Sequence, residues 1–385
     1  MATAVILGAG MMAHGLAYDL TRFGRLETLT IADISDNAAQ TLAEKVRGPA
    51  IATKFDAQDR QQLYDLASNH EIVISALPYH FNYTIAEICA ETGAHMVDLG
   101  GNSRIVQQQL ALDAEAKAKG GTIIPDLGLA PGMMTVLTMD ICRHFSEIDT
   151  VKIRVGGLPQ TKKAPFDYQL TFSPEGLINE YREPCMSLHN FRRTMKEPLT
   201  ELETIVFPPP FGELEAFTTS GGTSTLPITL EGKARELDYK TIRYPGHCEK
   251  MRILMSMGLF DEEPVEIQGE KIRPRDILSQ LLYKKLPKNQ PDVVLARTSV
   301  TGRKESGDSC TIENQIIDYF DEETQLTAMM RTTAFPTSII ALMILNGQIN
   351  VKGAVPAEIA VDAEKLKKEL KKRDILVEEI IRHGD

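Results

Sequence analysis

The sequence is short of positive charge and of paired cysteines, and both shortages exclude classes of protein. It has 42 lysines and arginines against 53 acidic residues, a formal net charge of −11, which argues against a general nucleic-acid or anionic-membrane surface. The five cysteines are scattered without any C-x-x-C pair, so neither a zinc site nor a disulfide framework is indicated. We therefore predict a protein of the reducing cytoplasm that binds no nucleic acid and no metal.

Long hydrophobic runs are also missing. The most apolar late run, residues 338–345, is too short to span a bilayer, and Met1 leads almost directly into a strand pattern instead of a signal peptide. We therefore expect no membrane partner. With 385 residues, 43% of them hydrophobic and 25% charged, the chain should form two globular domains with large cores.

A glycine turn near the N-terminus is the most informative stretch. The apolar residues 5–7 predict a buried parallel strand, which leads into Gly8-x-Gly10-x-x-Ala13 and a run of helix formers. Gly8 permits a tight turn, Gly10 lets a pyrophosphate approach the backbone, and Ala13 allows close packing of helix on strand. The first helical amides, at Met11 and Met12, would then face the anion.

An acid at the end of the next strand indicates which dinucleotide binds. Asp33 ends a strand pattern and lies 20 residues beyond Ala13, near the spacing for a hydrogen bond to ribose. Its carboxylate would accept a hydrogen bond from a 2′-hydroxyl and repel a 2′-phosphate. No Arg or Lys occurs in residues 34–37. We therefore favour a dinucleotide site over a chance glycine-rich turn, and NAD over NADP.

The alternation of strand and helix patterns continues to about Leu129, where we place the main domain boundary. Asp56 follows a third strand, where it either lies near the adenine or caps a helix. A fourth strand is expected from Glu71 to Pro78, which stops it. Its carboxyl end lies at the edge of an open sheet where ligands collect, so we expect Ala76, Leu77 and Pro78 beside the nicotinamide. Tyr79 in the same loop is a candidate substrate contact, whereas His80 is interpreted as a surface or packing histidine.

The second half of the chain has the alternating patterns of a largely antiparallel sheet. Strands are expected at residues 151–155, 168–172, 203–207 and 226–230, and again between 293 and 328, with a helix over 247–257. A buried helix is expected over 338–345 and a solvated one over 364–382. Uncharged sheet segments favour a homo-oligomer.

The predicted fold class is α/β, with a Rossmann doubly wound parallel sheet and a second, mixed α+β catalytic domain. The NAD-binding domain covers residues 1–128, with 334–352 packing back on it. The catalytic domain covers 129–333, and a C-terminal helical segment covers 353–385.

Several segments resemble the saccharopine dehydrogenase-like family of NAD(P)-dependent amino-acid oxidoreductases. First-domain marks are Ser75-Ala-Leu-Pro78 and Thr92-Gly-Ala-His-Met-Val-Asp98, followed by Asp126-Leu-Gly-Leu-Ala-Pro-Gly132. Second-domain segments are similar to the lysine 6-dehydrogenase branch: Val155-Gly-Gly-Leu-Pro159, Glu175-Gly-Leu-Ile-Asn-Glu-Tyr181, Thr219-Ser-Gly-Gly-Thr-Ser-Thr225 and Tyr239-Lys-Thr-Ile-Arg-Tyr-Pro-Gly-His247.

The resemblance implies deamination of an amino acid by hydride transfer to NAD, with the ε-amine of L-lysine as the expected substrate. Saccharopine-forming members often carry an acid in the Leu-x-Pro-Gly turn, where this chain has Ala130. That departure favours a simple amino-acid substrate. The alternatives are a saccharopine- or carboxyspermidine-type reductase that joins an aldehyde to an amine, and a non-catalytic dinucleotide-binding sensor.

Oxidation of an amine carbon requires a neutral amine, so a base must take its proton. His247 is a candidate base because histidine titrates near neutral pH, although it could instead cap a helix. Asp126 could hold an ammonium group or assist the base, or it could be a simple turn residue. Arg243 could bind a substrate carboxylate through two parallel hydrogen bonds, or lie on the surface of a strand. Thr223 could order the substrate, or belong to a hairpin turn.

Overall fold

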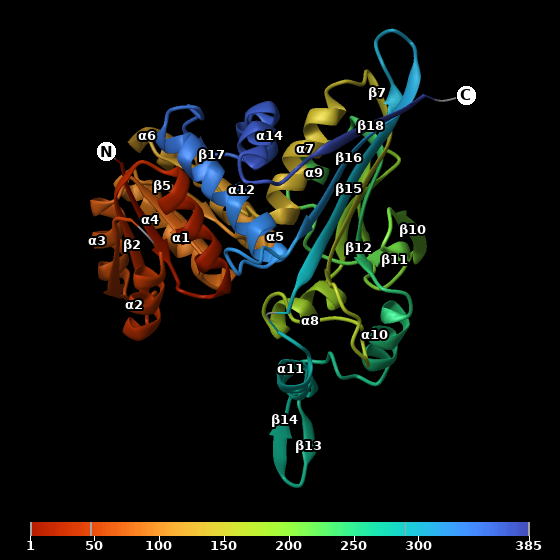
Figure 1. Ribbon diagram of the computed structural model, residues 1–385, viewed down its shortest axis with the longest axis horizontal. Coiled ribbons are helices and arrows are strands. Elements are labelled where there is room, and N and C mark those ends of the chain that lie inside the picture. Colours follow the sequence, from red (N-terminus) through yellow and green to blue (C-terminus); the bar gives the residue numbers. More distant parts are fainter. Residues whose placement is uncertain (1, 47, 289, 384–385) are drawn as a thin grey trace. The chain divides into compact units, whose positions relative to one another are not determined.

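The computed structural model describes residues 2–46, 48–288 and 290–383, and the chain divides into two compact units (Figure 1). Unit 1 comprises Met1–Asp140 and Met330–Leu376, and unit 2 comprises Ile141–Met329 and Val377–Asp385. The chain passes from one unit to the other within two helices, α7 (Met134–Cys142) and α12 (Ala328–Leu345), and a third time between Leu376 and Val377. Residues 334–352, which were expected to pack on the first domain, lie in unit 1.

Unit 1 is built on a parallel sheet with the strand order β17-β6-β5-β4-β1-β2-β3. The strand order reverses between β1 and β4, which is the switch point of a doubly wound Rossmann fold and the place where such folds bind dinucleotides. The predicted fold class is therefore confirmed for this unit. The strands are β1 (Ala2–Leu7), β2 (Leu26–Asp33), β3 (Ala50–Lys54), β4 (Ile72–Ser75), β5 (His95–Asp98), β6 (Thr122–Ile124) and β17 (Gly353–Ala354).

Two helices of unit 1, over residues 36–45 and 60–69, begin where a short polar side chain satisfies the first backbone amides. Ser35 accepts from the Ala38 amide, and Asp59 accepts from the amides of Gln61 and Gln62. The sequence pattern of residues 107–119 predicts a single helix, and this prediction is wrong, because the chain turns between two separate helices. The helices are α1 (Met11–Phe23), α2 (Asp36–Lys45), α3 (Arg60–Asn69), α4 (Asn82–Thr92), α5 (Ser103–Leu110), α6 (Asp113–Lys119), α13 (Ala357–Ala360) and α14 (Ala363–Lys371).

A buried ion pair joins the two sequence segments of unit 1. Asp19 on α1 is fully buried, and it accepts from Arg373 Nε at 2.6 Å and from Arg373 Nη2 at 3.0 Å. Ser338 on α12 donates to the same carboxylate at 2.5 Å. The guanidinium also lies over the Phe23 ring, 4.1 Å from its centroid. These contacts hold residues 330–376 against the first helix.

Helix α12 is the one helix within residues 2–46, 48–288 and 290–383 that has the length and apolar composition to cross a membrane. However, 83% of that window is buried inside the structure, as in the core helix of a globular protein. The expectation that the chain has no membrane partner stays a prediction.

Unit 2 contains a mixed sheet with the main order β10-β11-β12-β7-β15-β16-β18, from which β8 and β9 branch at β12. Strands β12 and β7 run parallel and the other pairs are antiparallel. This is the predicted mixed second domain. The strands are β7 (Glu147–Pro159), β8 (Cys185–His189), β9 (Arg192–Lys196), β10 (Glu203–Phe207), β11 (Gly212–Thr218), β12 (Ala234–Arg243), β15 (Asp292–Arg303), β16 (Ser309–Tyr319) and β18 (Glu378–His383).

The remaining elements of unit 2 are helices and one separate hairpin. The N-terminus of helix α10 is satisfied by a buried carboxylate from the sheet, since Glu215 accepts from the Gly246 and Cys248 amides. The hairpin forms a two-stranded sheet of its own beside α11 (Figure 1). The elements are α8 (Pro174–Arg182), α9 (Leu226–Thr229), α10 (His247–Ser256), α11 (Pro274–Lys285), β13 (Val265–Ile267) and β14 (Glu270–Ile272).

Three secondary-structure predictions for the second half are wrong. Residues 226–230 form helix α9, because Pro227 in its first turn has a backbone angle suited to a helix start. The segment 168–172 forms no strand: residues 168–171 are buried, and only Leu170 makes a bridge, to Lys288. The C-terminal segment 353–385 is not wholly helical: residues 378–383 form β18, which gives the edge of β16 a backbone partner.

Candidate functional site

The glycine turn between β1 and α1 gives each glycine a distinct role. Gly8 has φ +99°, and a Cβ added there would lie 3.1 Å from the Ala76 carbonyl oxygen at the end of β4. The turn therefore needs glycine at this position. Gly10 has ordinary extended angles, φ −75° and ψ −173°. A Cβ added at Gly10 meets no described atom within 4 Å, so the space beside it is open for a ligand.

The first turn of α1 can receive an anion. Gly10 is its N-cap and supplies no side-chain acceptor, so the amides of Met11 and Met12 have no acceptor within the helix. Ala13 is fully buried where α1 packs. An open glycine, helix amides and a nearby acid together fit the pyrophosphate and ribose of a dinucleotide.

Asp33 at the end of β2 holds this turn in place. Its Oδ2 accepts from the Ala9 amide at 2.7 Å and its Oδ1 accepts from the Ser35 amide at 2.8 Å. The structure also places Lys54 beside Asp33, because these residues are register partners in the parallel pairing of β2 with β3. Lys54 is exposed. Sequence reasoning missed it, since it considered only the residues directly after Asp33.

The remaining predicted cofactor residues lie along the same edge of the sheet. Asp56 accepts from the Gln58 amide at 2.9 Å, while Asp59 is the residue that caps α3. The helix-cap alternative for Asp56 is therefore wrong, and its contact with the cofactor stays a prediction. Residues 76–78 follow β4, and the Ala76 amide donates to the Leu7 carbonyl at 2.8 Å.

The two residues of the following loop differ in exposure. Tyr79 is half-buried, and a Cβ added at Gly101 would lie 3.3 Å from its side chain. His80 is exposed, which agrees with a surface histidine. The contact of Tyr79 with a substrate stays a prediction.

A buried hydrogen-bond network joins the ends of β4, β5 and β6. Asp98 is fully buried, and its carboxylate accepts from the Asn82 amide at 3.0 Å and from the Gln109 amide at 2.7 Å. The backbone amides of Gly100 and Asp126 donate to it as well, at 2.7 and 3.1 Å. Burial raises the pKa of Asp98 despite these donors. Sequence reasoning missed this network, although acid and amide residues at strand ends could have indicated it.

Asp126 sits at the centre of the turn that follows β6. It is 6% exposed with φ +62°, a left-handed conformation that Asp adopts more readily than most residues. Its Oδ1 accepts from the Gly101 amide at 3.2 Å, and a Cβ at Gly100 would overlap its carboxylate. These contacts support the turn-residue alternative. Binding of an ammonium group by Asp126, or its help to the base, stays a prediction. Asp126 belongs to unit 1, whereas His247 belongs to unit 2.

His247 is the first residue of α10 and is 1% exposed. Its Nδ1 lies 3.0 Å from the Phe166 carbonyl oxygen and its Nε2 lies 3.0 Å from the Tyr181 hydroxyl. Because a carbonyl only accepts, Nδ1 carries the proton and Nε2 accepts from Tyr181. The capping alternative for His247 is wrong, since Glu215 accepts the hydrogen bonds of the Gly246 and Cys248 amides at this end of α10. Both ring nitrogens are engaged, so its assignment as the base stays a prediction that this geometry does not favour.

Arg243 and His247 are brought together through Tyr181. Arg243, at the end of β12, is 3% exposed, and its Nε donates to the Tyr181 hydroxyl at 2.8 Å. Its guanidinium lies 4.8 Å from the centroid of the Tyr168 ring, and its Nη2 is 3.5 Å from Glu180 Oε1. The surface-arginine alternative is therefore wrong. Glu180, Tyr181 and Tyr168 are members of this cluster that sequence reasoning did not select, although two of them end the Glu175-to-Tyr181 segment.

Thr223 lies in the hydroxyl-rich loop after β11. It is 3% exposed and donates to the Met186 carbonyl at 3.0 Å. The Thr223 hydroxyl thus has a hydrogen-bond partner within the protein. A contact between Thr223 and a substrate stays a prediction. In the same loop Gly222 is required for packing, because a Cβ there would overlap the Tyr239 ring.

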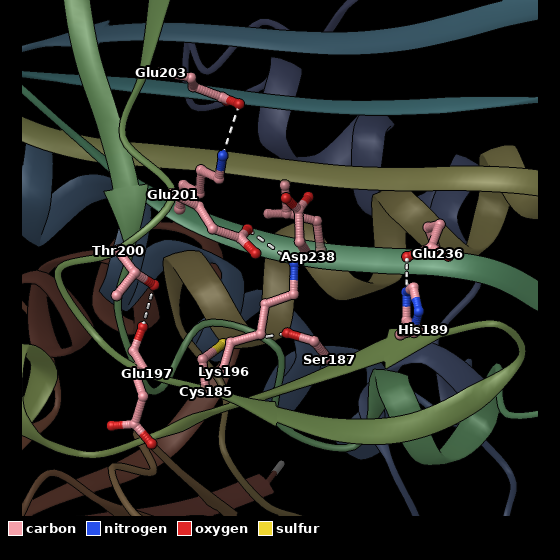
Figure 2. Close-up of polar contacts among 12 residues, drawn as sticks. Cys185, Ser187, His189, Lys196, Glu197, Thr200, Glu201, Glu203, Glu236 and Asp238 are labelled. Carbon is pink, nitrogen blue, oxygen red and sulfur yellow. Dashed lines mark hydrogen bonds and ion pairs between the residues drawn. The ribbon is translucent and has the colours of Figure 1, made fainter.

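A second charged cluster occupies the opposite side of β12, since side chains alternate along a strand. Arg154 on β7 pairs with both Asp238 and Glu203, and Lys240 donates to Glu203 at 2.7 Å. Figure 2 shows Glu203 and Asp238 of this cluster together with the more exposed Lys196–Glu201 pair. Cations and carboxylates neutralise one another there, so this cluster stabilises the sheet and leaves the Arg243 cluster as the candidate substrate site.

The burial of His247 predicts a pH dependence of stability. Burial and the charge of Arg243 lower the pKa of His247 to about 3, whereas the pKa of a histidine in an unfolded chain is about 6.5. Between these values the unfolded chain binds a proton that the folded chain does not. His247 should therefore contribute a loss of about 1.4 kcal/mol in unfolding free energy per pH unit as the pH falls below about 6.5.

Urea denaturation at pH 7 and pH 5 measures this effect. A His247→Gln variant should lose less stability between the two pH values than the wild type, because Gln binds no proton in the unfolded chain. His189→Gln, at a histidine whose side chain is 64% exposed, is the control and should follow the wild type. Equal pH slopes for wild type and His247→Gln would contradict the prediction.

The fold and the glycine turn define a two-domain Rossmann protein with a dinucleotide-binding domain. Residues 4–124 match the model of the saccharopine dehydrogenase NADP binding domain, and residues 128–376 match that of the saccharopine dehydrogenase C-terminal domain. The chain belongs to the saccharopine dehydrogenase family, as the sequence motifs predicted.

Similar proteins have related names. Mouse mitochondrial alpha-aminoadipic semialdehyde synthase is 24% identical over 91% of this chain and 44% of its own length. Saccharopine dehydrogenase [NADP(+), L-glutamate-forming] of Saccharomyces cerevisiae is 23% identical over 72% of this chain and 63% of its own length. This chain therefore spans less than half the length of its mammalian relatives.

Among solved structures, apo saccharopine dehydrogenase (L-Glu forming) from S. cerevisiae has the same fold. Its TM-score is 0.80 at 19% identity, and the match covers 99% of this chain and 100% of that one. At this identity the likeness shows the fold alone.

Proposed function

We propose that the protein is an NAD-dependent oxidoreductase that oxidises an amine of an amino acid, with the ε-amine of L-lysine as the preferred substrate. The observation that carries the proposal is the glycine turn, in which open space at Gly10 and the Asp33 carboxylate lie at the switch point of the sheet. Membership of the saccharopine dehydrogenase family supports an amino-acid substrate. A cytoplasmic location and a homo-oligomeric state remain part of the proposal.

The proposed reaction is balanced by water and by one hydride acceptor. The lysine Cε loses a hydride to the nicotinamide, which supplies the oxidising equivalent when it is bound. Loss of a proton from the ammonium precedes this step, and water then hydrolyses the resulting imine to the 6-semialdehyde and ammonia. The chain's part is to hold the dinucleotide at Gly10, Met11 and Met12 and to orient the substrate.

Preference for NAD follows from the charge of Asp33. A 2′-phosphate would lie against this carboxylate and be repelled by it. Asp33→Ala should therefore make NADP binding more favourable by about 1–3 kcal/mol and reduce the preference for NAD over NADP. Kinetic constants for both cofactors measure the ratio. Asp36→Ala is the control, because Asp36 is an exposed carboxylate in the first turn of α2.

Two facts make this cofactor test decisive. The fungal relatives are named as NADP(+) enzymes, and Lys54 beside Asp33 is a cation that could meet a 2′-phosphate. A wild type that uses NADP as well as NAD would show that the assignment of Asp33 is wrong. Loss of NADP use in Lys54→Gln would then identify the residue that overrides it.

A saccharopine-type reductase is the second candidate, because the relatives carry that name. The first reaction forms a reduced dinucleotide and the second consumes one, so the absorbance of the reduced dinucleotide distinguishes them. Formation of NADH from L-lysine and NAD supports the first proposal, whereas consumption of NADPH or NADH with a semialdehyde and glutamate supports the second. Dinucleotide binding without either reaction would indicate a sensor.

A further inference from the structure

Glu180 and Arg243 place opposite charges side by side in the polar cluster of unit 2. Glu180 Oε1 lies 3.5 Å from Arg243 Nη2, longer than a direct hydrogen bond. Thr241 on β12 donates to the same Oε1 at 2.6 Å and so holds the carboxylate. The Glu180 side chain is 16% exposed, and its Oε2 accepts no hydrogen bond from the described residues. One carboxylate oxygen is therefore available to a ligand.

Arg243 is held so that one end of its guanidinium is also available. Its Nε donates to Tyr181 and its Nη1 donates to the Ile242 carbonyl at 3.0 Å. Within the described structure its Nη2 makes no hydrogen bond and only the longer ion pair with Glu180. Since Tyr181 donates onward to His247, the bonds from Phe166 through His247 and Tyr181 fix the position of the guanidinium.

An ammonium group needs a hydrogen-bond acceptor, and His247 does not offer one in this cluster. Its Nδ1 proton is given to Phe166 and its Nε2 is occupied by Tyr181. An arginine has no acceptor at all. Glu180 is thus the acceptor in the cluster that combines a negative charge, partial exposure and an unused oxygen.

We propose that Glu180 and Arg243 together bind the head of an α-amino acid, with Glu180 accepting from the α-ammonium and Arg243 donating to the α-carboxylate. An α-amino acid carries these two charges on neighbouring groups of one carbon, so it complements a carboxylate and a guanidinium that lie side by side. The inference rests on the proposed function and names how its substrate is recognised. It makes Glu180 a specificity-determining residue and His247 a positioning residue.

Three ligands separate the two halves of this site. L-Lysine has both head groups, 6-aminohexanoate lacks the α-amine, and 1,5-diaminopentane lacks the carboxylate. Isothermal titration calorimetry in the presence of NADH measures their affinities without requiring turnover. The wild type should bind lysine about 10- to 100-fold more tightly than 6-aminohexanoate, which is the range expected for one charged hydrogen bond.

In Glu180→Gln that preference should disappear, because lysine weakens while 6-aminohexanoate does not. Gln keeps an oxygen for Thr241, so the local fold should be retained, and Glu180→Asp should recover part of the preference. Arg243→Lys should weaken lysine and 6-aminohexanoate alike and leave 1,5-diaminopentane unchanged. Glu183→Gln is the matched control, since Glu183 ends the same helix but faces Arg275, Arg182 and Glu262.

The outcomes separate this inference from the proposed function. Glu180-dependent binding of lysine without NADH formation would overturn the proposed reaction and support the head-group site. An unchanged preference in Glu180→Gln, or no lysine binding by the wild type, would overturn the inference. Normal NADH binding by each variant shows that unit 1 is intact in these tests.

Discussion

Replacing Asp19 with alanine is expected to lower the free energy of unfolding by about 3–5 kcal/mol, as for other broken buried ion pairs. The Arg373 side chain is only 1% exposed, and a guanidinium cannot shed its proton when its partner is lost. Glu369 would remain near Nη1 at 2.9 Å, but Nε and Nη2 would lose the carboxylate that they share. Urea denaturation followed by circular dichroism measures the loss.

An exposed ion pair in the same unit is the control for this prediction. Arg60 bonds Glu87 with side chains that are 51% and 35% exposed, and Glu87→Ala should cost less than about 1 kcal/mol. A double variant, Asp19→Ala with Arg373→Met, should recover part of the loss, since no unpaired charge then stays buried. Similar losses for Asp19→Ala and Glu87→Ala would show that the buried pair contributes little.

Gly10→Val is expected to weaken dinucleotide binding by at least about 100-fold while the protein stays folded. The Gly10 backbone angles suit any residue, and an added Cβ meets no described atom. The valine methyl groups would fill the space beside the first amides of α1, where the pyrophosphate must lie. Losing two charged hydrogen bonds there, at about 1.5–3 kcal/mol each, costs at least about 3 kcal/mol in all, which yields the stated factor.

Fluorescence titration with NADH measures the affinity, and urea denaturation checks the fold. Gly10→Ala adds a smaller side chain at the same place and should weaken binding less than valine does. If Gly10→Val bound NADH as tightly as the wild type, the dinucleotide would not lie against this turn. A large loss of stability would instead show that the glycine serves the fold.

The sequence alone determined the glycine turn of the first unit and its ligand class, because the signals there are local. Strand, glycine turn, helix and acid follow one another within residues 3–33, so short-range periodicity and turn chemistry were sufficient. The same holds for the fold class, since alternating β–α patterns form a parallel sheet. Local signals failed where tertiary contacts decide the structure, as in the C-terminal strand β18.

Only the tertiary structure decided which charges meet. Asp19 pairs with Arg373 over 354 positions, and Arg243 meets Tyr181 over 62, separations that no local pattern spans. The register of β2 with β3 placed Lys54 beside Asp33, and the packing of α8 on the end of β12 placed Glu180 beside Arg243. Burial then set the protonation of His247, because the sequence indicates which groups titrate but only the fold determines their solvent and partners.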